Sequence, residues 1–303
     1  MFPTPQAAHR RAALLLAFCA LLWSIAGVIT RHLEAADGFE ITFWRGLFCA
    51  LTMLAILGWQ RRGNPFAPVR EMGWPGLFSG AMWGVMFTCF MLALTRTSVA
   101  NTLLVMSVAP LFAAVLGRIV LGTRVSGATA LAILMAGAGI WWMVREGVSA
   151  DGVAGMAIAL AVPVASAINI VTLKRLHAEV DLAPAVLVGA VLCCIATAPL
   201  AWPFEASAGD LALLALLGAV QLAIPCFLMI RAVRQLAPHE VALIALLEVV
   251  LGPIWAWLGA GEAMPAATIQ GGLVVLVALI GDTLLARRAL QAAPAAAQPA
   301  GLH

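Results

Sequence analysis

Apolar residues fill this chain in ten stretches, and polar residues gather in the short segments between them. A membrane-spanning helix needs about 20 apolar residues, so the pattern predicts spans at 12–31, 39–59, 74–94, 98–118, 126–144, 153–173, 183–203, 209–230, 239–258 and 266–286. The ten spans divide into two sets of five. Because a set of five ends on the side of the membrane opposite to its start, a second copy must be inverted. We therefore expect an all-α integral membrane protein with ten transmembrane helices in two inverted five-helix repeats.

The composition agrees with a membrane protein. The chain is 63% hydrophobic and only 10% charged, and its mean hydropathy is +1.03. A water-soluble core does not need so much apolar sequence, so the lipid bilayer is an expected partner. The first apolar run is long and lacks a convincing cleavage site, which favours a retained span over a signal peptide. The Ala/Pro-rich segment 287–303 is predicted to be a disordered C-terminal tail.

Basic residues are distributed unevenly between the predicted helices. With the N-terminus inside, thirteen of the 17 Lys and Arg residues fall on the cytoplasmic side and three, Arg31, Arg96 and Arg145, fall outside. Arg45 lies within the second span. The positive-inside rule therefore places both termini in the cytoplasm. We expect a multi-pass protein of a bacterial-type inner (plasma) membrane.

Several classes of chemistry lack the residues they need. The six cysteines lie within predicted spans, and the five histidines lie in tails or near helix ends. No His, Cys and acid cluster has the spacing of a metal site, and no phosphate-binding GxxxxGK[ST] motif occurs. We expect no metal, no cofactor, no nucleic-acid partner and no enzymatic activity. The oligomeric state is left open.

A sequence motif repeats between the two halves at a constant offset of 139 residues. Segments 110–129 and 249–268 each join the fourth helix of a half to the fifth. The alignment pairs Gly122 with Gly261 and Thr123 with Glu262, and it pairs Ala-Thr at 128–129 with Ala-Thr at 267–268. This match supports the internal repeat.

Further motifs connect the chain to a known family. They are Leu247-Glu248 followed by Gly261-Glu262, Trp23-Ser24 in the first span, and Phe43-Trp44-Arg45-Gly46 in the second. In these motifs the chain resembles EamA-type members of the drug/metabolite transporter superfamily over nearly its whole length. It departs from the family pattern at Val249, where proline is usual, and at Thr123, where glutamate is usual.

The resemblance implies EamA repeats at 12–146 and 153–286, and a secondary transporter that works by alternating access. A small metabolite or amino acid is the expected substrate, and export is the expected direction. Uncoupled facilitation or exchange is one alternative. A non-transporting membrane scaffold or sensor with a transporter fold is another.

Polar and deep aromatic side chains within the spans are candidates for substrate binding, because polar groups are expensive in a bilayer. They are Trp23, Ser24, Trp83, Thr88, Ser107, Asn169, Gln221 and Glu248. The resemblance places the central cavity on helices 1, 3, 4, 6, 8 and 9, which agrees with this set. Glu248 either exchanges a proton or pairs with a substrate amine, or it is a permanently neutral packing residue. The deep tryptophans, Trp255 included, either stack on substrate or pack between helices.

Arg45 is a candidate contact for an anionic substrate group such as a carboxylate. The interpretation that we prefer on sequence grounds is that it snorkels to the outer headgroups, or pairs with Glu40 or another acid. Glu40, Glu262 and Asp282 lie near helix ends and are assigned to the membrane interface. Glycines 76, 80 and 84 predict a close helix contact. Prolines 110, 163, 225 and 253 predict kinks within their spans.

Overall fold

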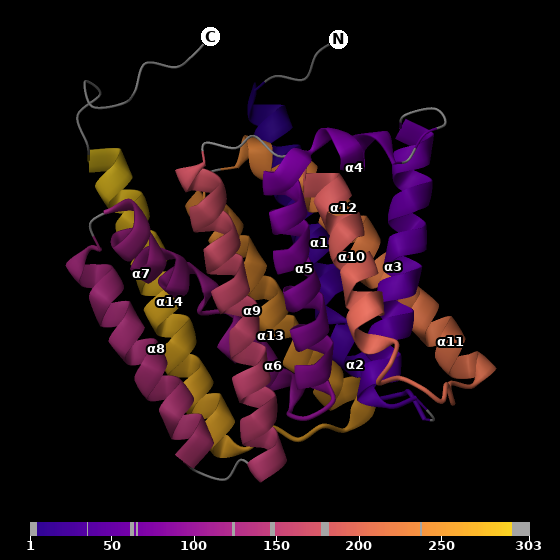
Figure 1. Cartoon of the computed structure of the whole chain (residues 1–303). Helices are drawn as coiled ribbons and strands as arrows, with labels where there is room; N and C mark the ends of the chain where they lie inside the picture. The colour runs from indigo at the N-terminus through magenta and orange to yellow at the C-terminus, as the bar shows by residue number, and fades with distance from the viewer. Residues whose placement is uncertain are drawn as a thin grey trace.

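The computed structural model describes residues 5–34, 36–60, 64, 66–122, 125–145, 149–176, 182–236 and 238–292, and their regular structure is entirely helical (Figure 1). The first half contains α1 (Pro5–Ser24), α2 (Ala26–Thr30), α3 (Gly38–Gln60), α4 (Ala67–Glu71), α5 (Gly73–Leu94), α6 (Val99–Met106), α7 (Ala109–Leu121) and α8 (Gly127–Arg145). The second half contains α9 (Ala150–Arg175), α10 (Leu182–Thr197), α11 (Ala208–Ala215), the π-helix η1 (Leu216–Ala223), α12 (Ile224–Ala232), the 3₁₀ turn η2 (Val233–Gln235), α13 (Pro238–Ala260) and α14 (Ala266–Ala292).

All ten predicted spans are helical. Within the described residues, nine helical stretches are long and apolar enough to cross a membrane, and α10 provides a shorter tenth. The predicted seventh span, 183–203, is too long, because α10 ends at Thr197. Pro199 follows two residues later and cannot continue a helix. The chain is therefore a multi-pass membrane protein in which one span is shorter than its hydrophobic pattern indicates.

Three spans are interrupted. The first changes from α1 to α2 at Ile25, and the fourth changes from α6 to α7 just before Pro110. The eighth passes through the π-helix η1 before Pro225 at the start of α12. Pro163 and Pro253 lie inside the continuous helices α9 and α13. Of the four predicted kinks, those at Pro110 and Pro225 thus coincide with breaks in the helix.

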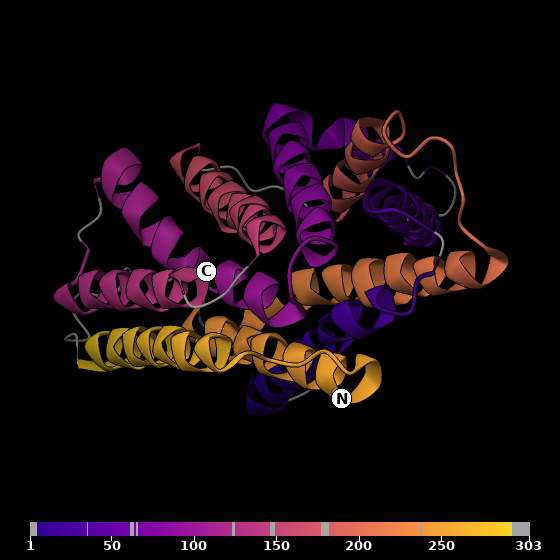
Figure 2. The same cartoon turned by 90° about the horizontal axis from the view of Figure 1, so that it is seen from below.

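Helix packing reproduces the inverted repeat. The third span, α5, packs on α9 and α10, and the eighth span packs in the same way on α1 and α3. The contact of α7 with α9 is matched by the contact of α13 with α1, while α8 pairs with its own counterpart α14 (Figures 1 and 2). Gly122 and Gly261, 139 residues apart, both end their helices with positive φ, at 68° and 66°. The fold is thus a ten-helix bundle of two inverted five-helix repeats.

The glycine face predicted on the third span forms a helix contact. Gly80 and Gly84 of α5 lie against α10, where a Cβ on Gly84 would approach the Gly189 carbonyl oxygen to 3.2 Å. Gly76 does not join this contact, since its nearest neighbour is Met72. Two of the three glycines therefore let α5 and α10 approach closely.

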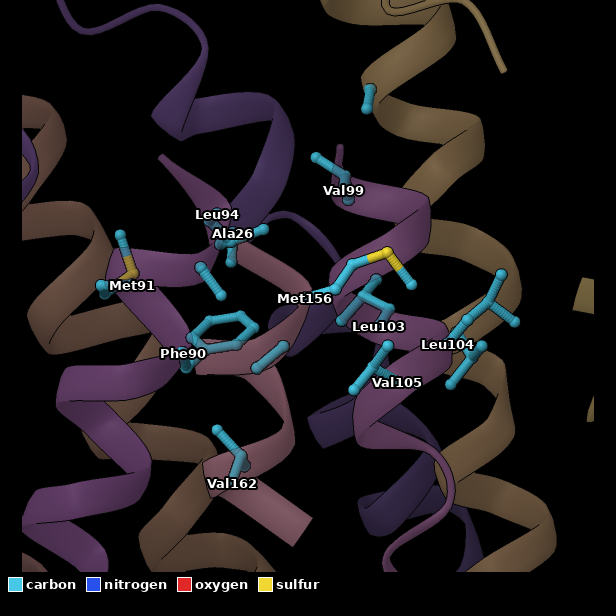
Figure 3. Close-up of a cluster of buried hydrophobic side chains, with 14 of the residues drawn as sticks. Ala26, Phe90, Met91, Leu94, Val99, Leu103, Leu104, Val105, Met156 and Val162 are labelled. Atoms are coloured by element: carbon cyan, nitrogen blue, oxygen red, sulfur yellow. The ribbon is translucent and has the colours of Figure 1, made fainter. Parts of the chain in front are cut away.

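The helices of the bundle end on two opposite sides, the terminal side and the distal side. The terminal side is where α1 begins and α14 ends, and the distal side holds residues 95–98 and 261–265. A large apolar cluster joins the distal halves of the spans from both repeats, with Leu94, Val99, Leu103 and Met156 among its members (Figure 3). A second cluster lies among α3, α5, α10 and α12. Polar residues between these clusters form the candidate site.

Candidate functional site

Arg45 is the buried charge at the centre of the bundle. It lies on α3 and is 2% exposed. Its Nη2 and Nε donate to Oε1 of Gln221 at 2.9 and 3.3 Å, and Nε2 of Gln221 donates to the Trp23 carbonyl oxygen at 3.1 Å. The network thus joins α3, η1 and α1. The preferred sequence interpretation, in which Arg45 snorkels to headgroups, is wrong because the guanidinium turns into the bundle, where an amide oxygen binds it.

Glu40 does not pair with Arg45, and its carboxylate is buried by the protein. It is 1% exposed, and its Oε1 accepts from the Trp44 indole N–H at 3.0 Å and from the Ala206 N–H at 2.9 Å. The Glu205 N–H donates to the same carboxylate. Glu40 therefore ties the first turn of α3 to the loop before α11, and it is unavailable to neutralise Arg45.

A small residue brings the second and eighth spans close enough for Arg45 and Gln221 to meet. Gly218, one turn before Gln221, faces α3, and a Cβ there would lie 2.5 Å from the carbonyl oxygen of Arg45 itself. The span is locally a π-helix, a form that is frequent at functional sites. The local sequence thus positions the glutamine amide against the guanidinium.

Glu248 supplies the opposite charge. It lies on α13, is partly exposed, and is electrostatically attracted to Arg45. Among the described residues its carboxylate accepts no hydrogen bond and forms no direct ion pair. The centre therefore holds a cation and an acid that influence each other while leaving most of their bonding capacity unused.

Ser24 and Trp255 link α1 to α13 beside this pair. The indole N–H of Trp255 donates to Ser24 Oγ at 3.0 Å, and Ser24 Oγ donates to the Leu21 carbonyl oxygen at 2.7 Å. Trp255 is outside the predicted binding set. Its signal is the depth of a tryptophan whose N–H needs an acceptor when buried.

Trp83 and Asn169 each carry a buried polar atom without a partner. Within the described structure, the indole Nε1 of Trp83 donates no hydrogen bond and Oδ1 of Asn169 accepts none. Ser79 Oγ also has no hydrogen-bond partner there. These residues lie on α5 and α9, which pack on each other. A buried polar group without a partner is destabilising. None of the three is bonded to the Arg45 network, and Trp83 packs against the apolar cluster of α3, α5, α10 and α12.

Two predicted site residues have other neighbours. Ser107 donates to its own helix at the Leu104 carbonyl oxygen, 2.7 Å away, at the break between α6 and α7. Thr88 lies beside Cys193, whose thiol donates to the Thr42 carbonyl oxygen at 3.8 Å and which lies near Arg45. The structure thus brings together Trp23, Ser24, Arg45, Gln221 and Glu248. It leaves Trp83, Thr88, Ser107 and Asn169 outside that network.

All six cysteines are free thiols, and five of them are buried. Three of them, Cys49, Cys193 and Cys226, lie around Arg45. No group of three or more His, Cys, Asp or Glu residues within the described ranges could hold a metal ion.

Two acids assigned to the interface bond across helices. Asp282 of α14 accepts from Thr129 Oγ1 of α8 at 2.7 Å. Glu262 binds Arg31 on the distal side, with 2.6 Å between Oε2 and Nε. The interfacial position of both acids stays a prediction, and the structure adds that the Glu262 side chain is 17% exposed and paired with a cation.

Comparisons with known proteins decide the family. The model of the EamA-like transporter family matches residues 10–145 and 153–281. The chain belongs to this family. EamA-like proteins are transporters with ten helices in two repeats, as the sequence resemblance implied. The domain boundaries 12–146 and 153–286 stay predictions.

A solved structure described only as "Crystal structure of protein" is similar to this EamA-like chain, with a TM-score of 0.64 and 20% sequence identity. The match covers 92% of this chain and 99% of that chain. At this identity the likeness shows the fold alone. No curated protein matches the chain.

Proposed function

We propose that this protein is a secondary active transporter that moves a small metabolite or amino acid across a bacterial-type inner membrane by alternating access. The observation that carries the proposal is the buried guanidinium of Arg45, which has the amide of Gln221 as its hydrogen-bond partner. A buried charge without a paired acid is expensive and marks a functional site in a membrane. Binding an anionic group of a substrate would offset that cost.

The substrate chemistry follows from the two charges. The guanidinium is a planar fork suited to a carboxylate, and the Glu248 carboxylate is suited to an amine or a proton. Trp23, Ser24, Gln221 and Trp255 surround these groups. A small zwitterion such as an amino acid satisfies both charges, which supports an amino acid over an uncharged metabolite. Trp83, Thr88, Ser107 and Asn169 are proposed to meet the rest of the substrate.

The direction of transport rests on topology. The uneven distribution of basic residues favours cytoplasmic termini, which turns the terminal side to the cytoplasm. A substrate taken up at the terminal side and released at the distal side would be exported. We propose export on this ground.

Proteoliposomes containing the purified full-length protein provide the test. They are loaded with the twenty standard amino acids, and release is measured by mass spectrometry with and without a pH gradient. We expect faster release of at least one amino acid than from liposomes with Arg45→Gln. Asp151→Asn, an exposed acid at the start of α9, is the matched control and leaves release unchanged.

The same assay separates the alternatives. If release responds to the pH gradient and Glu248→Gln abolishes that response, the carrier is proton-coupled through Glu248. Release that ignores the gradient, and that Glu248→Gln does not alter, identifies an uncoupled facilitator or exchanger. If amino acids and a soluble metabolite extract are released no faster than from empty liposomes, a scaffold or sensor replaces the transport proposal.

A further inference from the structure

Arg31 binds three segments at once on the distal side. Its Nε donates to Glu262 Oε2 at 2.6 Å, and its two terminal nitrogens donate to the carbonyl oxygens of Leu94 and Thr97 at 2.6 and 2.8 Å. The other oxygen of Glu262 accepts from the Val99 N–H at 2.7 Å. Arg31 and Val99 belong to the first repeat and Glu262 to the second. The ion pair therefore joins the two repeats at one side of the bundle.

The Gly-Glu motif explains how Glu262 reaches this position. Gly261 ends α13 with φ of 66°. Its N–H donates to the Trp257 carbonyl oxygen, and the Glu262 N–H donates to the Ala256 carbonyl oxygen, both at 3.1 Å. This is the αL helix ending for which glycine is favoured. The chain turns back at once, so the glutamate side chain points at Arg31 rather than into headgroups.

On the interior side of the ion pair, the distal ends of the first, fourth and ninth spans are tightly packed. Gly252 of α13 faces Leu103 of α6, and a Cβ on the glycine would overlap the leucine side chain. A Cβ on Gly27 of α2 would likewise overlap the Val99 side chain. Leu103 and Val99 belong to the apolar cluster in Figure 3. This layer contains residues of both repeats, and a surface pocket of about 380 Å³ lies beside the ion pair, with Arg31, Asn101 and Thr268 in its lining.

The terminal side is packed differently. The fourth span is interrupted at Ser107, and α6 packs on both α13 and α9 whereas α7 packs mainly on α9 (Figure 2). The side chains of 240–246 in the terminal half of α13 are all partly exposed. The fourth and ninth spans are thus packed together through their distal halves, and the terminal half of α13 is less buried.

The ion pair has no sequence counterpart in the other repeat. The residue that corresponds to Glu262 is Thr123, which follows Gly122 and lies outside the described residues. A threonine carries no charge and cannot form an ion pair. The fold repeats itself, but the acid occurs in one half alone.

We propose that Arg31 and Glu262 form a latch that holds the distal gate shut and must break before substrate is released on that side. This inference rests on the proposed transport function. The latch can open because the Arg31 and Glu262 side chains are 26% and 17% exposed, so water can replace the hydrogen bonds between them. On the terminal side the repeats are joined by His9 Nε2 of α1 and Glu240 Oε1 of α13 at 3.2 Å, with side chains 49% and 30% exposed. Because this contact is longer and more exposed than the latch, the protein without substrate rests open to the terminal side and receives substrate there.

Cysteine labelling tests the latch directly. Ala26 of α2 is 2% exposed beneath the ion pair, and Ala26→Cys introduces a reporter there. The full-length protein is treated with a membrane-impermeant maleimide from the distal side, and the chain without the reporter gives the background. We expect Glu262→Gln to raise the labelling rate about tenfold, the population change expected for losing one charge-assisted hydrogen bond. Asp151→Asn leaves the rate unchanged.

Two further variants keep the test decisive. Arg31→Lys retains the charge but cannot reach all three acceptors at once, so its labelling rate falls between those of the parent and Glu262→Gln. If Glu262→Gln does not reach the membrane, Glu262→Asp, which keeps the charge on a shorter side chain, is expected to raise the rate by a smaller factor. Rates within twofold of the parent in all folded latch variants would overturn the proposal.

The labelling result is independent of transport. A raised labelling rate in a protein that moves no solute in proteoliposomes supports the latch and rejects the transport function. Solute movement with unchanged labelling in the latch variants rejects the latch and supports the transport function.

Discussion

Removing the amide of Gln221 tests whether Arg45 depends on it. Gln221→Leu leaves the guanidinium without a hydrogen-bond acceptor among the described residues. The charge-assisted bonds share one oxygen and together contribute about 2 kcal/mol, and the bond from Gln221 to the Trp23 carbonyl oxygen adds about 1 kcal/mol. We expect a loss of about 3 kcal/mol in the free energy of unfolding. For a chain of this length the midpoint of thermal unfolding falls by about 5 °C.

Thermal unfolding of the purified protein in detergent, followed by tryptophan fluorescence, measures the change. The matched control is the double variant Arg45→Met with Gln221→Leu. Removing both partners leaves neither the guanidinium nor the amide unpaired, so the double variant is expected to regain about 2 kcal/mol relative to Gln221→Leu. It is also expected to bind no substrate.

Two results would refute this reasoning. A midpoint within about 2 °C of the parent for Gln221→Leu would mean that Arg45 is not held by the amide. Additive effects of the two substitutions would mean that the side chains do not interact, because residues in direct contact give a coupling energy.

Two further predictions concern packing and a single hydrogen bond. A Cβ on Gly139 would lie 2.6 Å from the Gly271 carbonyl oxygen, so Gly139→Ala should force α8 from α14 and lower stability by about 1 to 3 kcal/mol. Gly137→Ala, with open space around it, is the control and should leave the unfolding midpoint unchanged or raise it. Trp255→Phe removes the donor to Ser24 and should cost about 1 kcal/mol, measured in the same unfolding assay.

The sequence predicts the architecture well because a bilayer leaves the chain few choices. Each span must be helical and about 20 residues long, so the apolar pattern is enough to place all ten helices. The repeat is visible because Gly122 and Gly261 both end a helix with positive φ, and glycine is favoured there. The seventh span is misjudged at its end because Pro199 stops the helix inside an apolar stretch.

The site is predicted less well because its partners are far apart in sequence. Arg45 bonds a residue 176 positions away, and Arg31 bonds one 231 positions away. An arginine near a helix end can turn outward to headgroups or inward to the bundle, and helix rotation decides between these. Rotation depends on contacts such as that of Gly218 with α3, which the hydrophobic pattern alone does not specify.

The central claim is that the protein moves a small charged metabolite past Arg45. The most direct measurement is release of a soluble metabolite extract from proteoliposomes, compared by mass spectrometry between the parent and Arg45→Gln. The account predicts that at least one small carboxylate-bearing metabolite leaves faster through the parent protein. Identical release profiles for the parent, Arg45→Gln and empty liposomes would contradict it.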